Sequence, residues 1–443
     1  MVNSLTAAEA ARRLGVKPAT LYAYVSRGVL SRGKAADGRG SLFDAAEIER
    51  LARRGRPRRP AGTVDITVES AITEITADAL RFRGFDATRL AVSRSFEEIA
   101  ELLWTGELRR AEATRTGAGE PWHATPAALA VGRGAQAVLP AGILPLERLQ
   151  VIVPAMATTD ALRLQLDESA VLAAGRNIIA GMVDCLPSPS GSATAGSSAA
   201  DASAADASDA ADASAADASA DTAAPASAGG TIAERLWSRL SDRRPSPGLL
   251  GALSAALVLL ADHELAASTL AVRAAASVRA DPYAVVGTGL GAMSGTLHGG
   301  ASLGAETLLA AARDPADVPR VVGELLRRGE KVPGFGHFVY RGGDPRALAL
   351  LDLVRRTAPK SGQLAVAEAV LAEMRHKSLP EPNIDFAVAT LARVAGMVTG
   401  AGEAIFAVAR TAGWIAHALE AYTGDDPLRP RAVYTGRPAI IEP

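Results

Sequence analysis

The chain has 443 residues, which is longer than one ordinary domain and long enough to bury a substantial core. Hydrophobic residues make up 48% and charged residues 21%, the balance of a soluble globular protein. The single cysteine, Cys185, excludes an internal disulfide and a cysteine-based zinc site. The longest uncharged apolar run, Gly248 to Ala261, is 14 residues long, shorter than the roughly 20 that span a bilayer. The first residues lack a signal peptide's apolar stretch, so we expect a cytoplasmic protein without a membrane role.

The net charge of −1 hides a charge asymmetry between the two ends of the chain. Residues 1–60 contain 13 Lys and Arg against 5 Asp and Glu, and the remainder carries the opposite excess. A basic head on an acidic body predicts two domains, of which the head is the one suited to a polyanion.

Residues 5–54 predict a compact helical unit. Thr6 and Glu9 have capping-box spacing at the start of a first helix, and Pro18 opens a second. A glycine-rich basic loop and a short strand at 42–43 follow, and Asp44 is placed to cap a third helix. This order resembles the winged helix-turn-helix head of MerR-type regulators and excisionase-like proteins.

The resemblance implies a DNA-binding domain over residues 1–54, followed by a basic linker at 55–62. The side chains placed to meet a DNA groove or its phosphates are Lys17, Thr20, Tyr22, Arg27, Arg32, Lys34 and Arg39. The alternative is a small helical domain whose basic surface keeps the chain soluble or binds another protein.

The body, residues 63–437, shows mainly helical periodicity. We predict helical segments at 75–87 (ITADALRFRGFDA), 95–110 and 147–166, with a capping box formed by Ser95 and Glu98. Between them and the next helical pattern, residues 187–230 repeat an Ala-Ser-Asp unit without Lys, Arg or aromatic residues. Such a tract cannot bury enough apolar surface to fold, so we predict a disordered insertion in an all-α body.

The candidate catalytic residues are three histidines, a carboxylate and several arginines. His298 and His337 lie in glycine-rich segments, TLHGG and GFGHF, and Asp385 follows a Pro-Asn helix breaker. Arginine forks bind carboxylates in a bidentate manner, and histidines with a carboxylate move protons next to a carbonyl. The set therefore predicts carbon–carbon chemistry on a polycarboxylate.

These segments closely resemble citrate synthase. The likeness runs in family order through ADHELAAST, SGTLHGGAS, PGFGHFVYRGGDPRA, NIDF, FAVARTAGWIAHALE and RPRAVYTG. It covers nearly all of residues 63–437 outside the insertion and implies large and small helical domains. It also implies a cytoplasmic homodimer that condenses acetyl-CoA with oxaloacetate and water, the citrate-forming reaction of the tricarboxylic acid cycle, with no metal and no permanently bound cofactor.

The resemblance assigns roles by position. Asp385 would remove a methyl proton from the acyl-CoA, and His298 would stabilise the enol through the thioester oxygen. His337 would polarise and protonate the oxaloacetate carbonyl. The residues implied to hold oxaloacetate are His263, Arg346, Arg410 and, from the neighbouring subunit, Arg429.

Three positions depart from the family pattern: Ala266 and Ser302 stand where the family has Asn, and Ala387 where it commonly has Tyr. They leave open a 2-methylcitrate synthase that uses propionyl-CoA, and a metabolite-sensing DNA-binding regulator built on the same fold. A dinucleotide-like pattern at 287–292 lacks strand–helix alternation around it, so we interpret its glycines as close helix packing.

Overall fold

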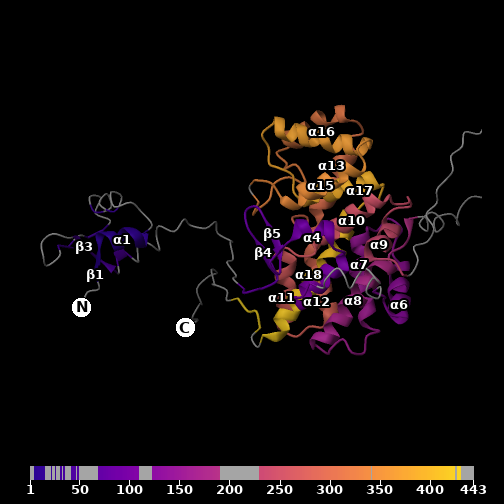
Figure 1. Cartoon of the computed structure of the whole chain (residues 1–443), viewed down its shortest axis with the longest axis horizontal. Helices are drawn as coiled ribbons and strands as arrows, with labels where there is room; N and C mark the ends of the chain where they lie inside the picture. The colour runs from indigo at the N-terminus through magenta and orange to yellow at the C-terminus, as the bar shows by residue number, and fades with distance from the viewer. Residues whose placement is uncertain are drawn as a thin grey trace, which may run out of the picture. The chain divides into compact units, whose positions relative to one another are not determined.

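A computed structural model describes residues 4–14, 21, 25, 30–31, 33–34, 41–45, 47–48, 68–108, 122–189, 229–340, 342–424 and 427–430 (Figure 1). The chain divides into two compact units, Met1–Val68 and Glu69–Pro443. The linker 55–62 and most of the predicted insertion, residues 190–228, lie outside the described residues. The domain boundaries drawn from the sequence therefore remain predictions.

The N-terminal unit combines a helix with a three-stranded antiparallel sheet. The elements are β1 (Ser4–Thr6), α1 (Ala7–Leu14), β2 (Gly33–Lys34) and β3 (Ser41–Asp44), in sheet order β1-β3-β2. The predicted capping box is present, because Glu9 accepts from the Thr6 backbone N–H at 2.9 Å. Its core contains Ala10, Ala11, Leu21, Leu30, Phe43 and Ile48.

The larger unit is predominantly helical, as predicted. The larger group of its helices consists of α4 (Ala87–Ser93), α5 (Phe96–Thr105), α6 (Pro126–Ala137), α7 (Pro145–Ala157), α8 (Glu168–Cys185), α9 (Ile232–Leu240), α10 (Pro247–Leu260), α11 (Ala267–Ser277) and α12 (Pro282–Met293). A second group packs together at the top of Figure 1: α13 (Gly300–Ala311), α14 (Val318–Arg327), α15 (Pro345–Thr357), α16 (Gly362–His376) and α17 (Ile384–Ala395). A short 3₁₀ turn, η3 (Pro315–Asp317), precedes α14.

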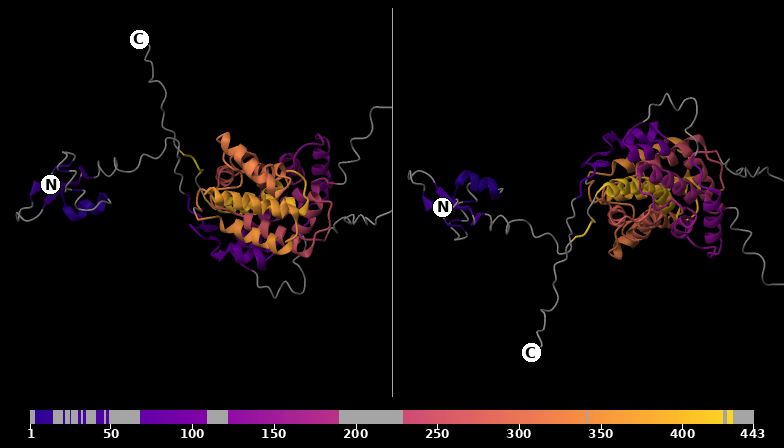
Figure 2. Two further views of the ribbon diagram at one scale, coloured as in Figure 1. Left: turned by 90° about the horizontal axis from the view of Figure 1, so that it is seen from above. Right: turned by 90° about the horizontal axis from the view of Figure 1, so that it is seen from below.

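Helix α18 (Ala401–Thr423) forms the centre of this unit. Nearly every residue from Ala401 to Ala418 is buried, so the helix is enclosed on all sides rather than amphipathic. Figure 2 shows it in yellow, running through the body between the other helices. It contacts helices of both groups, including α11 and α12 in the first and α13 and α17 in the second, and so connects the two groups.

The prediction of a helix over residues 75–87 is wrong. The segment forms β5 (Leu80–Phe82) and β6 (Phe85–Asp86). In the antiparallel sheet β5 is the central strand, with β4 (Thr73–Ile75) on one side and β6 on the other. Arg83 (φ 49°) and Gly84 (φ 88°) form the two-residue loop between Phe82 and Phe85. A loop with both residues at positive φ matches the twist of a hairpin, and this turn signal outweighs the helical spacing of the apolar residues.

Other local predictions meet mixed outcomes. The capping box of Ser95 and Glu98 is confirmed at the start of α5. The helix expected over 147–166 ends at Ala157, where the hydroxyls of Thr158 and Thr159 donate to carbonyls of its last turn. Among the described residues, no helix is both long and apolar enough to cross a bilayer.

Candidate active site

Six of the seven residues predicted for the substrate site come together from separate places in the fold. His263 lies between α10 and α11, His298 in the turn before α13, and His337 in the loop before α15. The others start or lie within helices: Arg346 in the first turn of α15, Asp385 in the first turn of α17, and Arg410 in the middle of α18.

His263, His337 and Tyr340 form a cluster of rings. The ring centroids of His263 and His337 are 5.3 Å apart, and that of Tyr340 lies 4.6 Å from His337. Nδ1 of His337 accepts from the backbone N–H groups of Val339 and Tyr340, at 3.0 and 3.3 Å. Because Nδ1 is an acceptor, the neutral ring carries its proton on Nε2, which is free to donate.

His298 is oriented by Ser268 from the first turn of α11. Its Nε2 lies 2.8 Å from the Ser268 hydroxyl, which also accepts from the Trp414 indole N–H at 3.3 Å. When Ser268 donates to Nε2, the proton of the neutral imidazole resides on Nδ1. The ring packs edge-on against Phe406 of α18, with 6.0 Å between centroids.

All three histidines are neutral at physiological pH. Burial, with the positive charge of Arg410, lowers the pKa of His298 to about 4. Burial and the charge of Arg346 also lower the pKa of His337, and the same effects with Arg410 hold the pKa of His263 well below its ordinary value. Neutral imidazoles here serve as hydrogen-bond donors rather than as cations.

Asp385 is positioned by the cap of α17. Asn383 caps this helix by accepting from the backbone N–H groups of Asp385 and Phe386. Oδ1 of Asp385 accepts a hydrogen bond of 2.5 Å from the Ser302 hydroxyl. Burial raises the pKa of Asp385 above its ordinary value, which makes the carboxylate a stronger base.

Arg346 is held rigidly by Asp344. Its Nε and Nη2 atoms donate to the two carboxylate oxygens at 3.0 and 2.8 Å, and both side chains are buried. Asp344 also accepts from the backbone N–H of Ile384, so one carboxylate joins the starts of α15 and α17. The guanidinium lies 5.6 Å from the centroid of the Tyr340 ring.

Arg410 is a buried cation in this group with two unused donor nitrogens. Its side chain is 1% exposed, and Nε donates to the Leu260 carbonyl at 2.8 Å. Nη1 and Nη2 have no hydrogen-bond partner among the described residues. Burial lowers the pKa of Arg410 to about 10, which still leaves the group charged at neutral pH. Two unpaired buried donors on one guanidinium require an anion, and their planar fork fits a carboxylate.

Arg429 does not join this group within the chain. It is exposed, and the backbone N–H of neighbouring Leu428 donates to Ser277 at the C-terminal end of α11. Ser268, beside His298, lies at the opposite end of the same helix. Arg429 is thus separated from the site by most of the helix, about 15 Å long.

The seven DNA-contact predictions are not decided by the structure. Lys34 lies in β2 without a described side chain, and the other six positions lie outside the described residues: Lys17, Thr20, Tyr22, Arg27, Arg32 and Arg39.

Four residues that orient the site were not predicted from the sequence: Ser268, Tyr340, Asp344 and Trp414. Each lies close in sequence to a predicted residue, or on the same helix as one, but only the fold shows which polar atom it faces. Ser302 stood out solely as a departure from the family pattern. The packing interpretation of the glycine pattern in α12 holds for Gly289, where a Cβ would lie 2.7 Å from the Trp414 ring, but not for Gly287, where a Cβ would meet no atom within 4 Å.

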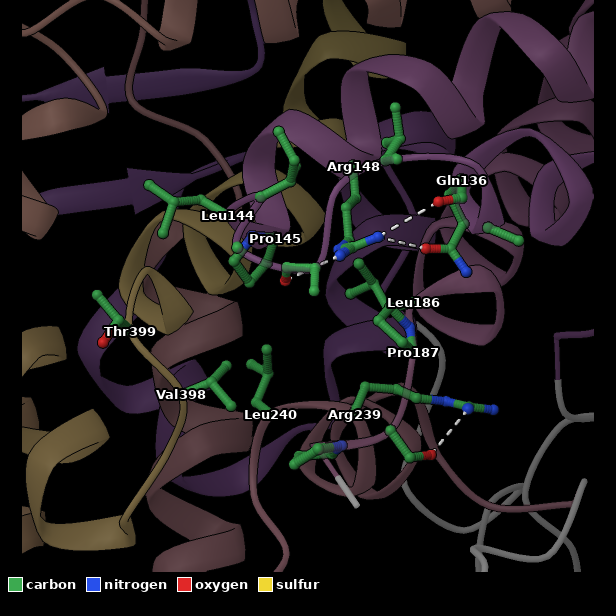
Figure 3. Close-up of a pocket in the computed structure, with 17 residues that line it drawn as sticks. Gln136, Leu144, Pro145, Arg148, Leu186, Pro187, Arg239, Leu240, Val398 and Thr399 are labelled. Atoms are coloured by element: carbon green, nitrogen blue, oxygen red, sulfur yellow. Dashed lines mark hydrogen bonds between the residues drawn. The ribbon is translucent and has the colours of Figure 1, made fainter. Parts of the chain in front are cut away.

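A separate cavity of about 540 Å³ lies among α6, α7, α9 and the loop between α17 and α18 (Figure 3). Arg148 on its wall is already paired with Gln136 at 2.8 Å. Val398 and Thr399 border the cavity beyond the C-terminal end of α17, whereas Asp385 lies at the other end of that helix. The cavity is therefore distinct from the cluster of histidines.

A family model described as citrate synthase, C-terminal domain, matches residues 62–431. The chain belongs to the citrate synthase family. A second model, described as a helix-turn-helix domain, matches residues 4–56. Both resemblances predicted from the sequence are confirmed. Among the described residues there is no cluster of three or more His, Cys, Asp or Glu side chains that could hold a metal ion.

Curated relatives include citrate synthase 2 of Bacillus subtilis, 37% identical over 212 residues, which are 46% of this chain and 56% of the relative. The chain thus spans little more than half the length of this relative. The 2-methylcitrate synthase of Mycobacterium tuberculosis is 27% identical over 398 residues, covering 88% of this chain and 93% of the relative.

Solved structures of citrate synthases share the fold of this chain. One is the citrate synthase of Thermoplasma acidophilum in a ternary complex with carboxymethyl coenzyme A and oxaloacetate, with a TM-score of 0.66 and 23% identity over 85% of this chain and 96% of that one. The enzyme of Thermotoga maritima has a TM-score of 0.63 and 23% identity, over 84% of this chain and 94% of that one.

Proposed function

We propose that this protein condenses a short acyl-CoA, acetyl-CoA in the first place, with oxaloacetate and water to give citrate and free CoA. The observation that carries the proposal is the unpaired Nη1 and Nη2 of buried Arg410, whose charge acts directly on His298 and Asp385. A dicarboxylate substrate supplies the anion that these donors lack.

Arg410, Arg346 and His263 hold oxaloacetate in this proposal. Arg410 takes one carboxylate through its two free donors, while Arg346 contributes positive charge from its fixed pair with Asp344. His337 is rigid and neutral with its proton on Nε2, so it donates to the ketone oxygen and polarises the carbonyl.

Asp385 removes a proton from the methyl group of the acyl thioester, and neutral His298 donates to the thioester oxygen of the resulting enol. The enol carbon then attacks the polarised ketone, and His337 protonates the alkoxide to give citryl-CoA. Water cleaves the thioester, which yields citrate and CoA. The raised pKa of Asp385 makes its carboxylate a better base, and the lowered pKa of His298 keeps its ring neutral, so that it acts as a hydrogen-bond donor to the enol oxygen.

Arg429 acts, in this proposal, in the active site of the partner subunit of a homodimer. Its exposure and its distance from the site of its own chain support this role. A closed two-fold dimer is the commonest way for one segment to complete the site of another copy.

The direct test is release of free CoA thiol from acetyl-CoA by the full chain. We expect release only when oxaloacetate is present. Absence of release with acetyl-CoA and with propionyl-CoA would contradict the proposal.

The alternative acyl donor is propionyl-CoA, which would make 2-methylcitrate. It is favoured by the relative of that name, which matches nearly its full length. One additional methylene changes selectivity by only about 10- to 200-fold, so kcat/KM for the two thioesters must be compared directly.

The N-terminal unit is proposed to bind DNA, with the seven predicted residues as contacts. Its support is the helix-turn-helix family match and the basic excess of the first 60 residues. The test is selection of a binding site from a random duplex library with the full chain. Binding that weakens with salt but enriches no sequence would contradict specific recognition. DNA binding that changes with oxaloacetate, in a protein that releases no CoA, would favour the metabolite-sensing regulator.

A further inference from the structure

The contact between Ser302 and Asp385 has a consequence for the proposed base. Ser302 lies in the first turn of α13, four residues after His298, and is fully buried. Its hydroxyl donates to Oδ1 of Asp385 at 2.5 Å, the short distance of a charge-assisted hydrogen bond. Oδ2 of Asp385 receives no hydrogen bond from the described residues.

The two carboxylate oxygens are therefore inequivalent. Oδ1 is fixed by a donor from α13, and Oδ2 is left to take a proton from the substrate. Because the carboxylate can rotate about its Cβ–Cγ bond, a donor on one oxygen also fixes the plane in which the other meets the methyl group. Such orientation is what a proton transfer from carbon requires.

The charges around Asp385 work in opposite directions. Burial raises its pKa, whereas the Ser302 hydrogen bond and the charges of Arg346 and Arg410 lower it, and the charge of Asp344 raises it. Ser302 thus partly offsets the effect of burial and keeps the base in its carboxylate form at lower pH. It is the neutral member of this set, so it can be removed without changing the net charge of the site.

The packing around Ser302 leaves little room for a larger side chain. A Cβ added at Gly402 of α18 would lie only 3.2 Å from the Ser302 Cβ. The close approach of α18 at Gly402 keeps α13 and α18 together at this position.

We propose that Ser302 is a positioning residue that holds Oδ1 of Asp385 and presents Oδ2 to the methyl group of the acyl-CoA. This inference rests on the proposed function, because it needs Asp385 to act as the base.

The test compares the pH dependence of kcat/KM for acetyl-CoA in wild type and Ser302→Ala. Loss of a hydrogen bond that favours the carboxylate raises the pKa of Asp385, so the acid limb moves to higher pH, by about one unit. We therefore expect the loss of activity to grow as the pH falls along the acid limb, approaching about tenfold below the pKa of the wild-type limb and becoming small at about pH 8. An unchanged acid limb in an active, folded variant overturns the inference.

Two further variants separate positioning from folding. Ser302→Thr keeps the hydroxyl and should restore the wild-type acid limb, even where its additional methyl group lowers stability. Ser268→Ala is the matched control, because it removes a serine hydroxyl from His298 instead of Asp385. It should lower kcat without moving the acid limb. A shift of equal size in Ser268→Ala would show that the effect is not specific to Ser302.

The inference and the proposed function fail in different ways. If wild type releases no thiol, the proposed function fails, and the pKa of Asp385 can still be followed by carboxyl NMR in protein labelled with carbon-13 aspartate. If wild type is active but Ser302→Ala titrates like wild type in both measurements, only the role of Ser302 is wrong.

Discussion

Nε2 of His417 lies 3.3 Å from Oδ1 of Asp262, and both side chains are fully buried. The other ring nitrogen of His417 contacts Arg273 at 2.9 Å, and Arg273 pairs with Glu420 at 2.7 Å. Burial acts to raise the pKa of Asp262, but the charges of His417 and Arg410 hold it below its ordinary value. The network ends next to His263, and its burial and contacts give His417 a structural role.

Replacing His417 should therefore unfold the protein more easily. His417→Ala leaves Asp262 and Arg273 as buried charges without their shared partner, which costs about 3–5 kcal/mol. The free energy of unfolding in urea measures this loss. Exposed His376 provides the control, since His376→Ala should change stability by less than about 0.5 kcal/mol. Equal effects of the two substitutions would contradict the role of the network.

Glu403 gives the protein a pH-dependent stability near neutrality. Burial, with the charges of Glu306 and Glu147, raises the pKa of this nearly buried side chain to about 7. A carboxyl whose pKa is raised on folding stabilises the protein fully below its unfolded pKa and loses that contribution as pH rises through the folded value. The affected window is about pH 4.5 to 7.

Glu403→Gln should therefore remove this loss. We expect the variant to be more stable than wild type at pH 8, by up to about 3 kcal/mol, with the advantage falling toward zero at pH 4.5. Urea unfolding at several pH values measures the difference. Glu107→Gln, at an exposed position, should show no such trend. A constant difference between Glu403→Gln and wild type across this range would rule out titration as the cause.

The helical body was predictable because its apolar residues recur at helical spacing and its helices carry strong caps, as at Ser95. The hairpin of β5 and β6 was missed because two apolar residues on a short strand, Leu80 and Phe82, also fit a helix face. The deciding signal was the Arg83–Gly84 turn, whose positive φ angles depend on pairing with neighbouring strands rather than on local spacing.

The candidate site was predictable residue by residue where chemistry requires a particular group, as for His298 and Asp385. The sequence could not reveal that Arg410 has two unpaired donors while Arg346 is already paired. That difference depends on which carbonyls and carboxylates the fold brings within 3 Å. Arg429 illustrates the same limit, because the role proposed for it in a neighbouring subunit depends on a second copy of the chain.

Asp385→Asn should keep the binding of oxaloacetate and lose most of the turnover. The amide preserves the shape of the side chain but cannot accept a methyl proton, and loss of general-base catalysis lowers rates by about 10²- to 10⁴-fold. Steady-state kinetics gives kcat, and calorimetric titration gives the Kd of oxaloacetate. A kcat within threefold of wild type would exclude Asp385 as the base.

Arg410→Lys should weaken oxaloacetate binding more than acyl-CoA binding. Lysine keeps a positive charge but lacks the planar pair of donors that meets a carboxylate. Loss of charge-assisted hydrogen bonds worth about 1.5–3 kcal/mol predicts a 10- to 100-fold rise in KM for oxaloacetate. Arg393→Lys, a half-buried arginine bonded to Gln363, is the control and should leave that KM within threefold. Equal KM values in wild type and Arg410→Lys would show that the free donors do not hold the substrate.

The last prediction concerns assembly. If Arg429 completes the active site of the partner subunit, a hybrid dimer contains one complete site. In that site the Arg429→Ala chain supplies Asp385, and the Asp385→Asn chain supplies Arg429. Each variant alone should be nearly inactive. Subunits mixed under exchange conditions should form hybrid dimers with one working site each, so up to half of the dimers, and about a quarter of all sites, regain activity.

Recovery must depend on exchange between subunits. The control is the same mixture after each homodimer has been cross-linked, which should stay inactive. Size-exclusion chromatography with light scattering checks that both variants are dimers before mixing. If the exchanged mixture shows only the sum of the two separate activities, each site is built from a single chain, and exposed Arg429 then has no part in it.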